Sequence, residues 1–296
     1  MAEAIKHDLH GQYDFDQWKA TGHRAGISLR VQDAWQSNAN VRKIACNQHI
    51  LDLLSRLYGR QAWPFQTLNF PVGTQQHYHT DSVHFSSNPE RFMCGVWVAM
   101  EDIDERNGPL MYFPGSHQWP IYTNEHIGRC IAQMPDSPSQ TLYEAMWRAL
   151  VEAHGATPDY FMARKGQALI WAANLMHGGT RQLDPDRTRW SQVSHYFFED
   201  CAYFTPMMSD VFYGSIAFRE LSNVVTGRVM ANRYAGQLVP AGFVAACDPA
   251  ARDWGGEFEF DAGLYLLANA DVAASGVNPY EHYLRFGRRE RRRLRP

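Results

Sequence analysis

Long apolar runs are missing from this 296-residue chain, and its first residues lack the pattern expected of a secretory leader. No stretch stays apolar over the roughly 20 residues that a membrane-spanning helix needs. Residues 1–10 are polar and carry both signs of charge, whereas a signal peptide begins with a basic segment followed by an apolar one. The sequence therefore predicts no membrane span, and we expect a cytoplasmic protein.

Cysteine is scarce and scattered, with five residues that never form a Cys-x-x-Cys pair. An odd number without regular spacing argues against a disulfide framework and against a zinc ribbon. A strong excess of charge is also lacking, because 28 basic and 31 acidic residues leave a net charge of −3. No global field attracts nucleic acid, so nucleic acid is not an expected partner. The sequence carries no signal for the oligomeric state.

Short aromatic and β-branched runs fill the middle of the chain, at 66–70, 93–100, 110–113, 168–173 and 190–198. Turn residues separate them, which is typical of an antiparallel β-sandwich or barrel. Helical spacing precedes the sheet at 41–58, where Gly59 is the expected end. A second helical pattern at 139–155, with Ser139 as a possible N-cap, interrupts the strands. We expect an inserted helix that packs against the sheet, with a lid as the alternative.

The end of the chain has a different texture. The pattern of residues 258–296 predicts a small helical module, in which a short helix begins at Pro279 and runs through Phe286. We therefore expect a main, mostly β domain at 1–250, with N-terminal helices and the inserted helix, and a helical module at 251–296. The run from Arg288 to Arg295 is expected to be a solvated basic end, with an acidic partner as the alternative. Residues 201–250 are ambiguous.

The densest group of possible metal ligands lies at 75–84, where His79 and Asp81 are two residues apart. On a strand such residues project from the same face, so both can reach one ion. His177 follows the apolar run 168–173 and precedes two glycines that allow backbone or ligand to approach closely. Two imidazoles and one carboxylate on one side of a metal suit Fe(II) and leave positions open. The same set also admits zinc or manganese.

An arginine stands at the head of the last apolar run. Arg189 shares a strand face with Val193 and His195. An inward-facing arginine needs an anionic partner, and its planar guanidinium binds a carboxylate through two parallel hydrogen bonds. We predict that Arg189 binds a dicarboxylate, and we expect Arg181 and Arg187 on a solvated loop.

Taken in order, these residues resemble the phytanoyl-CoA dioxygenase family of Fe(II)- and 2-oxoglutarate-dependent oxygenases. The resemblance covers about residues 60–200 and rests on His79-Thr80-Asp81, Trp97-Val98-Ala99-Met100-Glu101 with Asn107-Gly108, Pro114-Gly115-Ser116-His117, His177-Gly178 and Arg189. It implies a mainly β fold with flanking helices, the double-stranded β-helix or cupin-like jelly roll, in agreement with the strand pattern. Residues 260–287 resemble a short module appended to many bacterial proteins.

The resemblance also implies a function and its residues. The chain would bind Fe(II) through His79, Asp81 and His177, and 2-oxoglutarate through Arg189, with Trp97 beside it and Gln66 hydrogen-bonded to it. With O2 as the other cosubstrate, it would hydroxylate a small-molecule substrate and release succinate and CO2.

Details of the resemblance bear on two of these residues. Asp81 speaks against a halogenating relative, in which that carboxylate is replaced to make room for halide. The interval from His177 to Arg189 is about one residue longer than usual in the family, so Arg187 stays an alternative.

The substrate itself is not identified by the sequence, since acyl thioesters, amino-acid derivatives, phosphonates and sugars all fit. Aromatic residues near the motifs are candidates for the substrate pocket, with packing in the core as the alternative, namely Tyr78, Phe85, Trp97, Tyr112 and Trp119. His84 and His117 are candidates for substrate or acid–base contacts, with packing or surface positions as the alternative.

Two other functions stay open. A cupin-type metalloenzyme would use His77, His79 and His177 without an oxo acid, because His77 and His79 also share a strand face. The third function is a non-catalytic jelly-roll module that binds a glycan.

Overall fold

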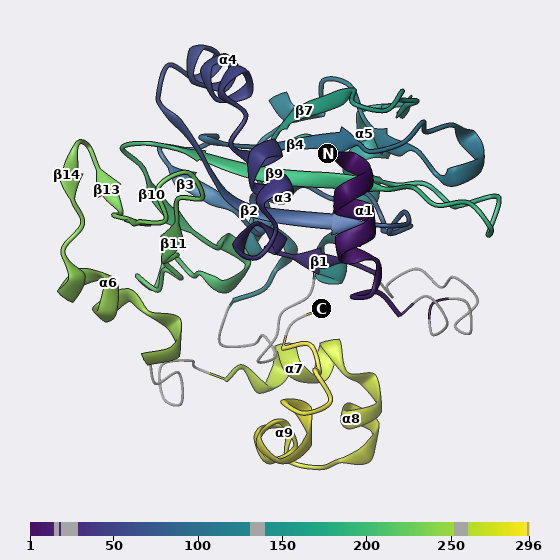
Figure 1. The fold of residues 1–296 in the computed structure, drawn as a ribbon. Coiled ribbons are helices and arrows are strands. Elements are labelled where there is room, and N and C mark those ends of the chain that lie inside the picture. The colour runs from purple at the N-terminus through teal and green to yellow at the C-terminus, as the bar shows by residue number, and fades with distance from the viewer. Residues whose placement is uncertain (15–17, 19–28, 131–139, 252–259, 295) are drawn as a thin grey trace.

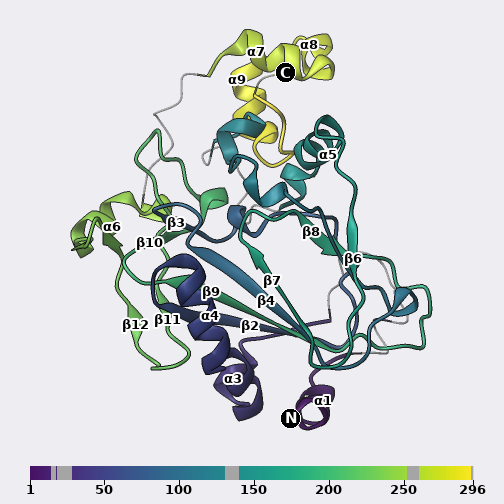
Figure 2. The same ribbon diagram turned by 90° about the horizontal axis from the view of Figure 1, so that it is seen from above.

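The computed structural model describes residues 1–14, 18, 29–130, 140–251, 260–294 and 296. Two antiparallel sheets form the body of the protein, and helices lie on the outer side of the larger one (Figures 1 and 2). The C-terminal helices lie at one side of this body (Figure 1). Within the described residues, no helix has both the length and the apolar character needed to cross a membrane.

Five strands form the larger sheet in the order β1-β2-β9-β4-β7. They are β1 (Val31–Gln32), β2 (Ala62–Phe70), β4 (Met93–Ala99), β7 (Ala168–Ala172) and β9 (Ser191–Phe198). Every pairing is antiparallel. The runs at 66–70, 93–100, 168–173 and 190–198 are strands of this sheet, so these predictions are confirmed.

The smaller sheet has the order β6-β5-β8, with β5 at Leu110–Tyr112, β6 at Asp159–Phe161 and β8 at His177–Gly179. An isolated antiparallel bridge between His79 and His177 pairs the segment around His79 with β8 and so extends the smaller sheet. Along the chain, successive segments therefore pass back and forth between the two sheets. This alternation defines a double-stranded β-helix, so the predicted jelly-roll fold is confirmed.

Apolar side chains fill the space between the sheets. Phe70, Trp97 and Val193 of the larger sheet pack against Leu110 and Phe161 of the smaller one. The period-two alternation of β-strands explains why these residues face inward while their neighbours face the helices.

Helices cover the outer face of the larger sheet (Figures 1 and 2). They are α1 (Ala2–His10), α3 (Ala39–Ala45) and α4 (Gln48–Tyr58). Ile5 and Leu9 of α1 pack with Val41 of α3 and with Trp190. Helix α4 buries Leu51 and Leu54 in a second apolar cluster.

The prediction of one helix at 41–58 is wrong, because the segment forms the two helices α3 and α4. Asn47 separates them, and its side-chain oxygen accepts a hydrogen bond from Ile50 N at 3.3 Å, which starts α4 as an N-cap. Gly59 ends α4 in the left-handed conformation with φ +70°, as the sequence predicts.

The inserted helix is confirmed as α5 (Glu144–Ala153), preceded by a 3-10 turn at Gln140–Tyr143; Ser139 lies outside the described residues. Tyr143 and Trp147 are buried against Val83, Phe113 and Met176. The helix therefore packs on the chain segments that carry the His79 motif and His177.

Residues 201–250 form short antiparallel pairs and one helix. β10 (Ala202–Phe204) pairs with β3 (Ser86–Asn88), β11 (Leu221–Ser222) with β12 (Val229–Met230), and β13 (Arg233–Tyr234) with β14 (Gln237–Leu238), before α6 (Ala241–Cys247).

The C-terminal helices are α7 (Ala262–Ala268), α8 (Ala270–Ser275) and α9 (Pro279–His282), and a π-helical turn at Tyr283–Gly287 continues α9. The expected helix that begins at Pro279 is thus confirmed. Tyr265 is fully buried, and its hydroxyl lies 2.9 Å from His282 Nδ1. The boundary at 250/251 stays a prediction, since residues 252–259 lie outside the described part of the chain.

Candidate metal and cosubstrate site

His79 and His177 face each other where two segments cross. The backbone N–H of each donates to the carbonyl of the other, at 2.8 and 2.9 Å. His79 Nδ1 lies 3.0 Å from the carbonyl of His77, and His177 Nδ1 lies 2.9 Å from that of Leu175. A carbonyl oxygen only accepts, so Nδ1 carries a proton in both rings, and Nε2 is the nitrogen that the neutral tautomer would offer to a metal.

The carboxylate of Asp81 also lies near the two imidazoles, but a turn and not a strand positions it there. The prediction that His79 and Asp81 lie on one strand is wrong, because Asp81 begins a 3-10 turn at Asp81–Val83. Asp81 Oδ1 lies 3.9 Å from His79 Nε2, and Oδ2 lies 3.9 Å from His177 Nε2. One ligand atom from each of the three residues falls within 4.8 Å of the others. The turn, rather than strand alternation, aims the carboxylate at the imidazoles.

Gly178 allows the close crossing of the two segments. A Cβ atom at this position would lie 2.9 Å from the Cα of Tyr78, which is too short for any side chain. Only glycine lets β8 approach the His79 segment closely enough for His79 and His177 to form their bridge.

Trp171 holds the carboxylate from the larger sheet. Its indole Nε1 donates a hydrogen bond of 2.7 Å to Asp81 Oδ2. The ring lies across Gly95 on the neighbouring strand β4, and a Cβ at that position would come within 2.4 Å of it. Neither residue was expected in the site from the sequence, because their contact depends on the pairing of β4 with β7.

The charge state of the group suits a divalent cation. Burial by itself would raise the pKa of Asp81, but the imidazoles of His177, His195 and His79 and the Trp171 hydrogen bond lower it to about 2. Burial lowers the pKa of His79 to about 3, and the neighbouring His177 adds to this effect. At neutral pH the site therefore combines a carboxylate with a neutral His79 imidazole, the forms that bind metal.

Arg189 lies in the same cavity, which has a volume of about 440 Å³ and is also lined by His79, Asp81 and His177. Its side chain is buried, with 3% of the residue exposed. Nη1 donates to the carbonyl of Gly108 at 3.0 Å, whereas Nε has no hydrogen-bond partner among the described residues. Burial lowers the pKa of Arg189 to about 10, so the guanidinium stays charged at neutral pH. A buried, charged group with an unused donor calls for an anion in the cavity.

The two alternative arginines lie elsewhere. Arg187 Nη1 makes an ion pair of 2.6 Å with Asp104 Oδ2 on the surface, and it does not line this cavity. Arg181 is exposed. Of the three arginines, only Arg189 can therefore meet a ligand inside the cavity.

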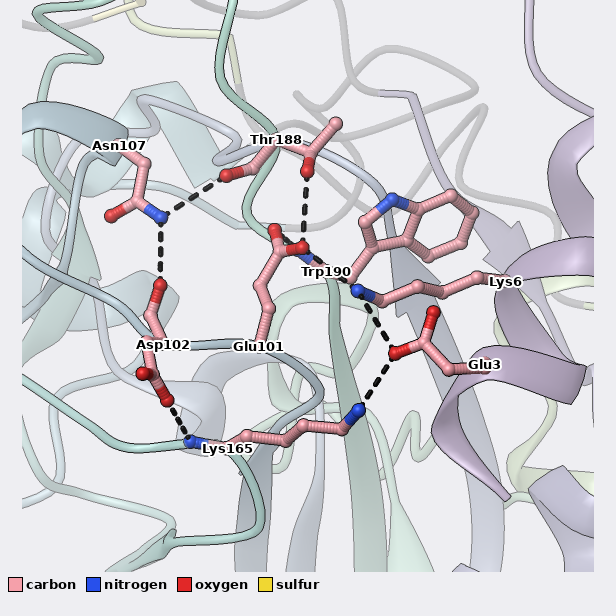
Figure 3. A network of polar contacts seen from close by, with 8 residues as sticks. All are labelled: Glu3, Lys6, Glu101, Asp102, Asn107, Lys165, Thr188 and Trp190. Carbon is pink, nitrogen blue, oxygen red and sulfur yellow. Dashed lines mark hydrogen bonds and ion pairs between the residues drawn. The ribbon is translucent and has the colours of Figure 1, made fainter.

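A polar network fixes the segment that carries Arg189 (Figure 3). Glu101, two residues after the end of β4, accepts hydrogen bonds from Thr188 Oγ1 at 3.1 Å and from Trp190 N at 2.7 Å. Lys6 of α1 donates to Glu101 Oε2 at 2.9 Å, and Asn107 Nδ2 donates to the carbonyl of Thr188 at 3.1 Å. The residues on both sides of Arg189 are thus held from three separate elements.

Trp97 and Gln66, both expected near a cosubstrate, line the cavity. The guanidinium carbon of Arg189 lies 5.6 Å from the centroid of a Trp97 ring. Gln66 Oε1 lies 2.9 Å from His195 Nδ1, so its side chain orients a third imidazole near Asp81. His195 Nε2 points to within 3.7 Å of Asp81 Oδ2. The sequence placed His195 on this strand face without assigning it to the site.

The aromatic and histidine predictions are partly correct. Phe85, Trp97 and His84 line the cavity. Three others follow the core alternative and do not line the cavity: Tyr78 packs against Phe113, Trp119 stacks on His154, and Tyr112 packs against the core between the sheets. His117 is exposed and does not line the cavity, as its surface alternative predicts. These residues belong to the right segments but point into the protein core or outward.

The histidine set of the cupin alternative does not come together. His77 Nδ1 lies 2.7 Å from the carbonyl of Tyr78, and His77 does not line the cavity. Among the described residues, the metal-binding geometry is met by His79, Asp81 and His177 only.

Comparison with known proteins decides the family. The model of the family described as phytanoyl-CoA dioxygenase (PhyH) matches residues 3–189, which is more than half of the chain. The chain belongs to the phytanoyl-CoA dioxygenase family. The matched range includes the proposed ligands and ends at Arg189.

Relatives of this phytanoyl-CoA dioxygenase family protein are distant. The peroxisomal phytanoyl-CoA dioxygenase of Rattus norvegicus is 25% identical over 135 residues, which cover 44% of this chain and 36% of the rat protein. The chain thus matches about a third of the length of that curated relative. Among solved structures, the non-heme alpha ketoglutarate dependent carbocyclase SnoK from nogalamycin biosynthesis is 18% identical with a TM-score of 0.46, over 63% of this chain and 69% of SnoK. EctD from S. alaskensis with bound Fe is 19% identical with a TM-score of 0.43, over 57% and 56%.

Proposed function

We propose that the chain is an Fe(II)- and 2-oxoglutarate-dependent dioxygenase that hydroxylates a small organic substrate. The observation that carries the proposal is the combination inside one cavity of three convergent ligand atoms and a buried arginine with an unused donor. A metal with open positions and a dicarboxylate are the two ligands that this combination suits.

His79, Asp81 and His177 are the proposed iron ligands. The donor set fits Fe(II), since both imidazoles present Nε2 and the carboxylate keeps Oδ1 free while Trp171 binds Oδ2. Bound iron, 2-oxoglutarate and O2 supply the oxidising chemistry, with succinate and CO2 as products beside the hydroxylated substrate. The carboxylate of Asp81 occupies the position that a halide would need, so hydroxylation is the proposed outcome.

Arg189 is the proposed partner of the far carboxylate of 2-oxoglutarate. Its charge is buried between Trp97 and the backbone of Gly108, so an ion pair there is shielded from water. Trp97 and Val193 line the same cavity and give it apolar walls. These groups orient the cosubstrate and exclude water, while Gln66 and His195 present polar atoms on the metal side.

Two single substitutions test the assignment against the cupin alternative. Asp81→Ala should abolish tight binding of Fe(II), measured by calorimetry under argon, and should abolish succinate formation from 2-oxoglutarate. His77→Ala should leave both unchanged, because His77 lies outside the ligand group. Loss of iron binding in His77→Ala with retention in Asp81→Ala would favour the cupin set. Failure of the unaltered protein to bind Fe(II) or form succinate would favour the non-catalytic module.

A further inference from the structure

Part of the cavity lining is polar and belongs neither to the proposed metal ligands nor to Arg189. It comprises Arg30, Gln32, His84 and Gln140, and Phe85 lines the same cavity. His84 Nε2 lies 3.0 Å from Gln140 Oε1, which leaves the amide nitrogen of Gln140 available to a ligand. A lining of amides, an imidazole and a cation binds hydrogen-bonding groups and offers little surface to a long acyl chain.

Arg30 is an unpaired cation at this part of the cavity. Its side chain is exposed at the rim and makes no hydrogen bond or ion pair with any described residue. Asp81 is the one acidic residue among the described residues that line the cavity, and the proposed metal would neutralise it. No protein carboxylate in the described lining therefore competes for Arg30.

A second arginine reinforces the positive potential. The guanidinium carbon of Arg219 lies 4.8 Å from the centroid of the Phe85 ring. Arg219 donates to the neutral Thr205 Oγ1 at 2.8 Å, and its Nε has no partner among the described residues. Phe85 lines the cavity, so Arg219 places a second positive charge next to this lining.

We infer that this polar part of the cavity lining binds a small, polar substrate through an anionic group, a carboxylate or a phosphate, with Arg30 as the partner of that group. Gln32 and Gln140 then hydrogen-bond to hydroxyl or amide groups of the same molecule. This inference rests on the proposed function, since it names the class of substrate for the same site. It places the anion at the rim and the uncharged remainder of the molecule toward the metal ligands.

The test uses three small probes on the full chain loaded with Fe(II) and 2-oxoglutarate under argon. Glycerol serves as the neutral probe. 3-Hydroxypropionate is the probe with a carboxylate group, and glycerol 3-phosphate is the probe with a phosphate group. Each is titrated while the visible charge-transfer absorption of the iron–2-oxoglutarate complex is followed, because a ligand beside the metal perturbs this band. We expect at least one anion to perturb the band at lower concentration than glycerol, and the stronger of the two identifies the anionic group.

Arg30→Gln should weaken binding of the anionic probe by roughly fivefold, which is the upper range for an ion pair at an exposed rim. The affinity for glycerol should stay unchanged. Arg56→Gln is the matched control, since Arg56 is also exposed but does not line the cavity. Equal affinity for glycerol and both anions, or anion binding that is unchanged in Arg30→Gln, would overturn the inference. Loss of the band itself would mean that the probe displaces 2-oxoglutarate from Arg189, which also overturns it. Succinate formation by the same preparations separates a failure of this inference from a failure of the proposed function.

Discussion

The backbone N–H of Trp190 donates a hydrogen bond of 2.7 Å to Glu101 Oε1, and this bond fixes the residue that follows Arg189 (Figure 3). The other oxygen of Glu101 holds Thr188, the residue that precedes Arg189. A carboxylate outside the cavity therefore determines where the arginine inside it points. Lys6 from the N-terminal helix completes the contact, which links α1 to the proposed cosubstrate site.

Glu101→Gln should weaken 2-oxoglutarate binding by about tenfold, because hydrogen bonds to a charged group contribute about 1.5–3 kcal/mol. The measurement is calorimetric titration of 2-oxoglutarate into the anaerobic Fe(II) protein. Iron affinity should not change, since Glu101 does not contact the ligand group. Glu105→Gln, at an exposed carboxylate, is the control. Equal effects of both substitutions would show that Glu101 does not position Arg189.

Arg189→Gln should raise the dissociation constant of 2-oxoglutarate by about a hundredfold, within the range of about 2–5 kcal/mol for truncating a buried charge pair. Arg187→Gln should change it less than about fivefold, because an exposed ion pair contributes at most about 1 kcal/mol. The same titration measures both variants. A larger effect for Arg187 would reverse the assignment of the two arginines.

Trp171→Phe should weaken Fe(II) binding by about 10- to 100-fold, the usual cost of removing a hydrogen bond that orients a metal ligand. Gly95→Ala should do the same, because a methyl group there displaces the Trp171 ring from Asp81. Competition with a chromophoric chelator measures both constants. Trp35→Phe is a matched control, since Trp35 Nε1 also donates to a carboxylate, that of Asp33, at 3.1 Å. A similar loss in Trp35→Phe would contradict the specific effect of Trp171.

The metal-free protein should lose stability as the pH falls from about 7 toward 4. Burial lowers the pKa of His195 to about 4, whereas an unfolded histidine titrates near 6.5. Between these values the unfolded state binds more protons than the native state, so the free energy of unfolding falls with pH. His195→Gln should reduce this fall by about 2 kcal/mol between pH 7 and 5, since one pKa unit corresponds to about 1.4 kcal/mol.

Urea unfolding of chelator-treated protein at the two pH values measures the difference. His49→Gln, at an exposed histidine, should leave the pH dependence as it is. An unchanged pH dependence in His195→Gln would show that His195 is already protonated in the native protein at pH 5.

Several parts of this protein follow from its sequence alone. The strands at 93–100 and 190–198 and the helix at 139–155 were predictable because the spacing of apolar residues reports local periodicity. The types and order of His79, Asp81, His177 and Arg189 by themselves indicate the family. Local pattern is sufficient here, since strand pairing and ligand chemistry depend on residue type and on near neighbours.

Tertiary structure decided how these residues meet. Asp81 lies on a 3-10 turn, and Trp171 crosses Gly95 to reach it, because β4 and β7 pair in a register that no local pattern specifies. Arg187 and Arg189 are two residues apart and equal in chemistry, so their spacing does not distinguish them. Burial distinguishes them, since Arg187 meets Asp104 in water while Arg189 is enclosed between two sheets. Contacts between segments far apart in the chain depend on packing, and packing is a property of the whole fold.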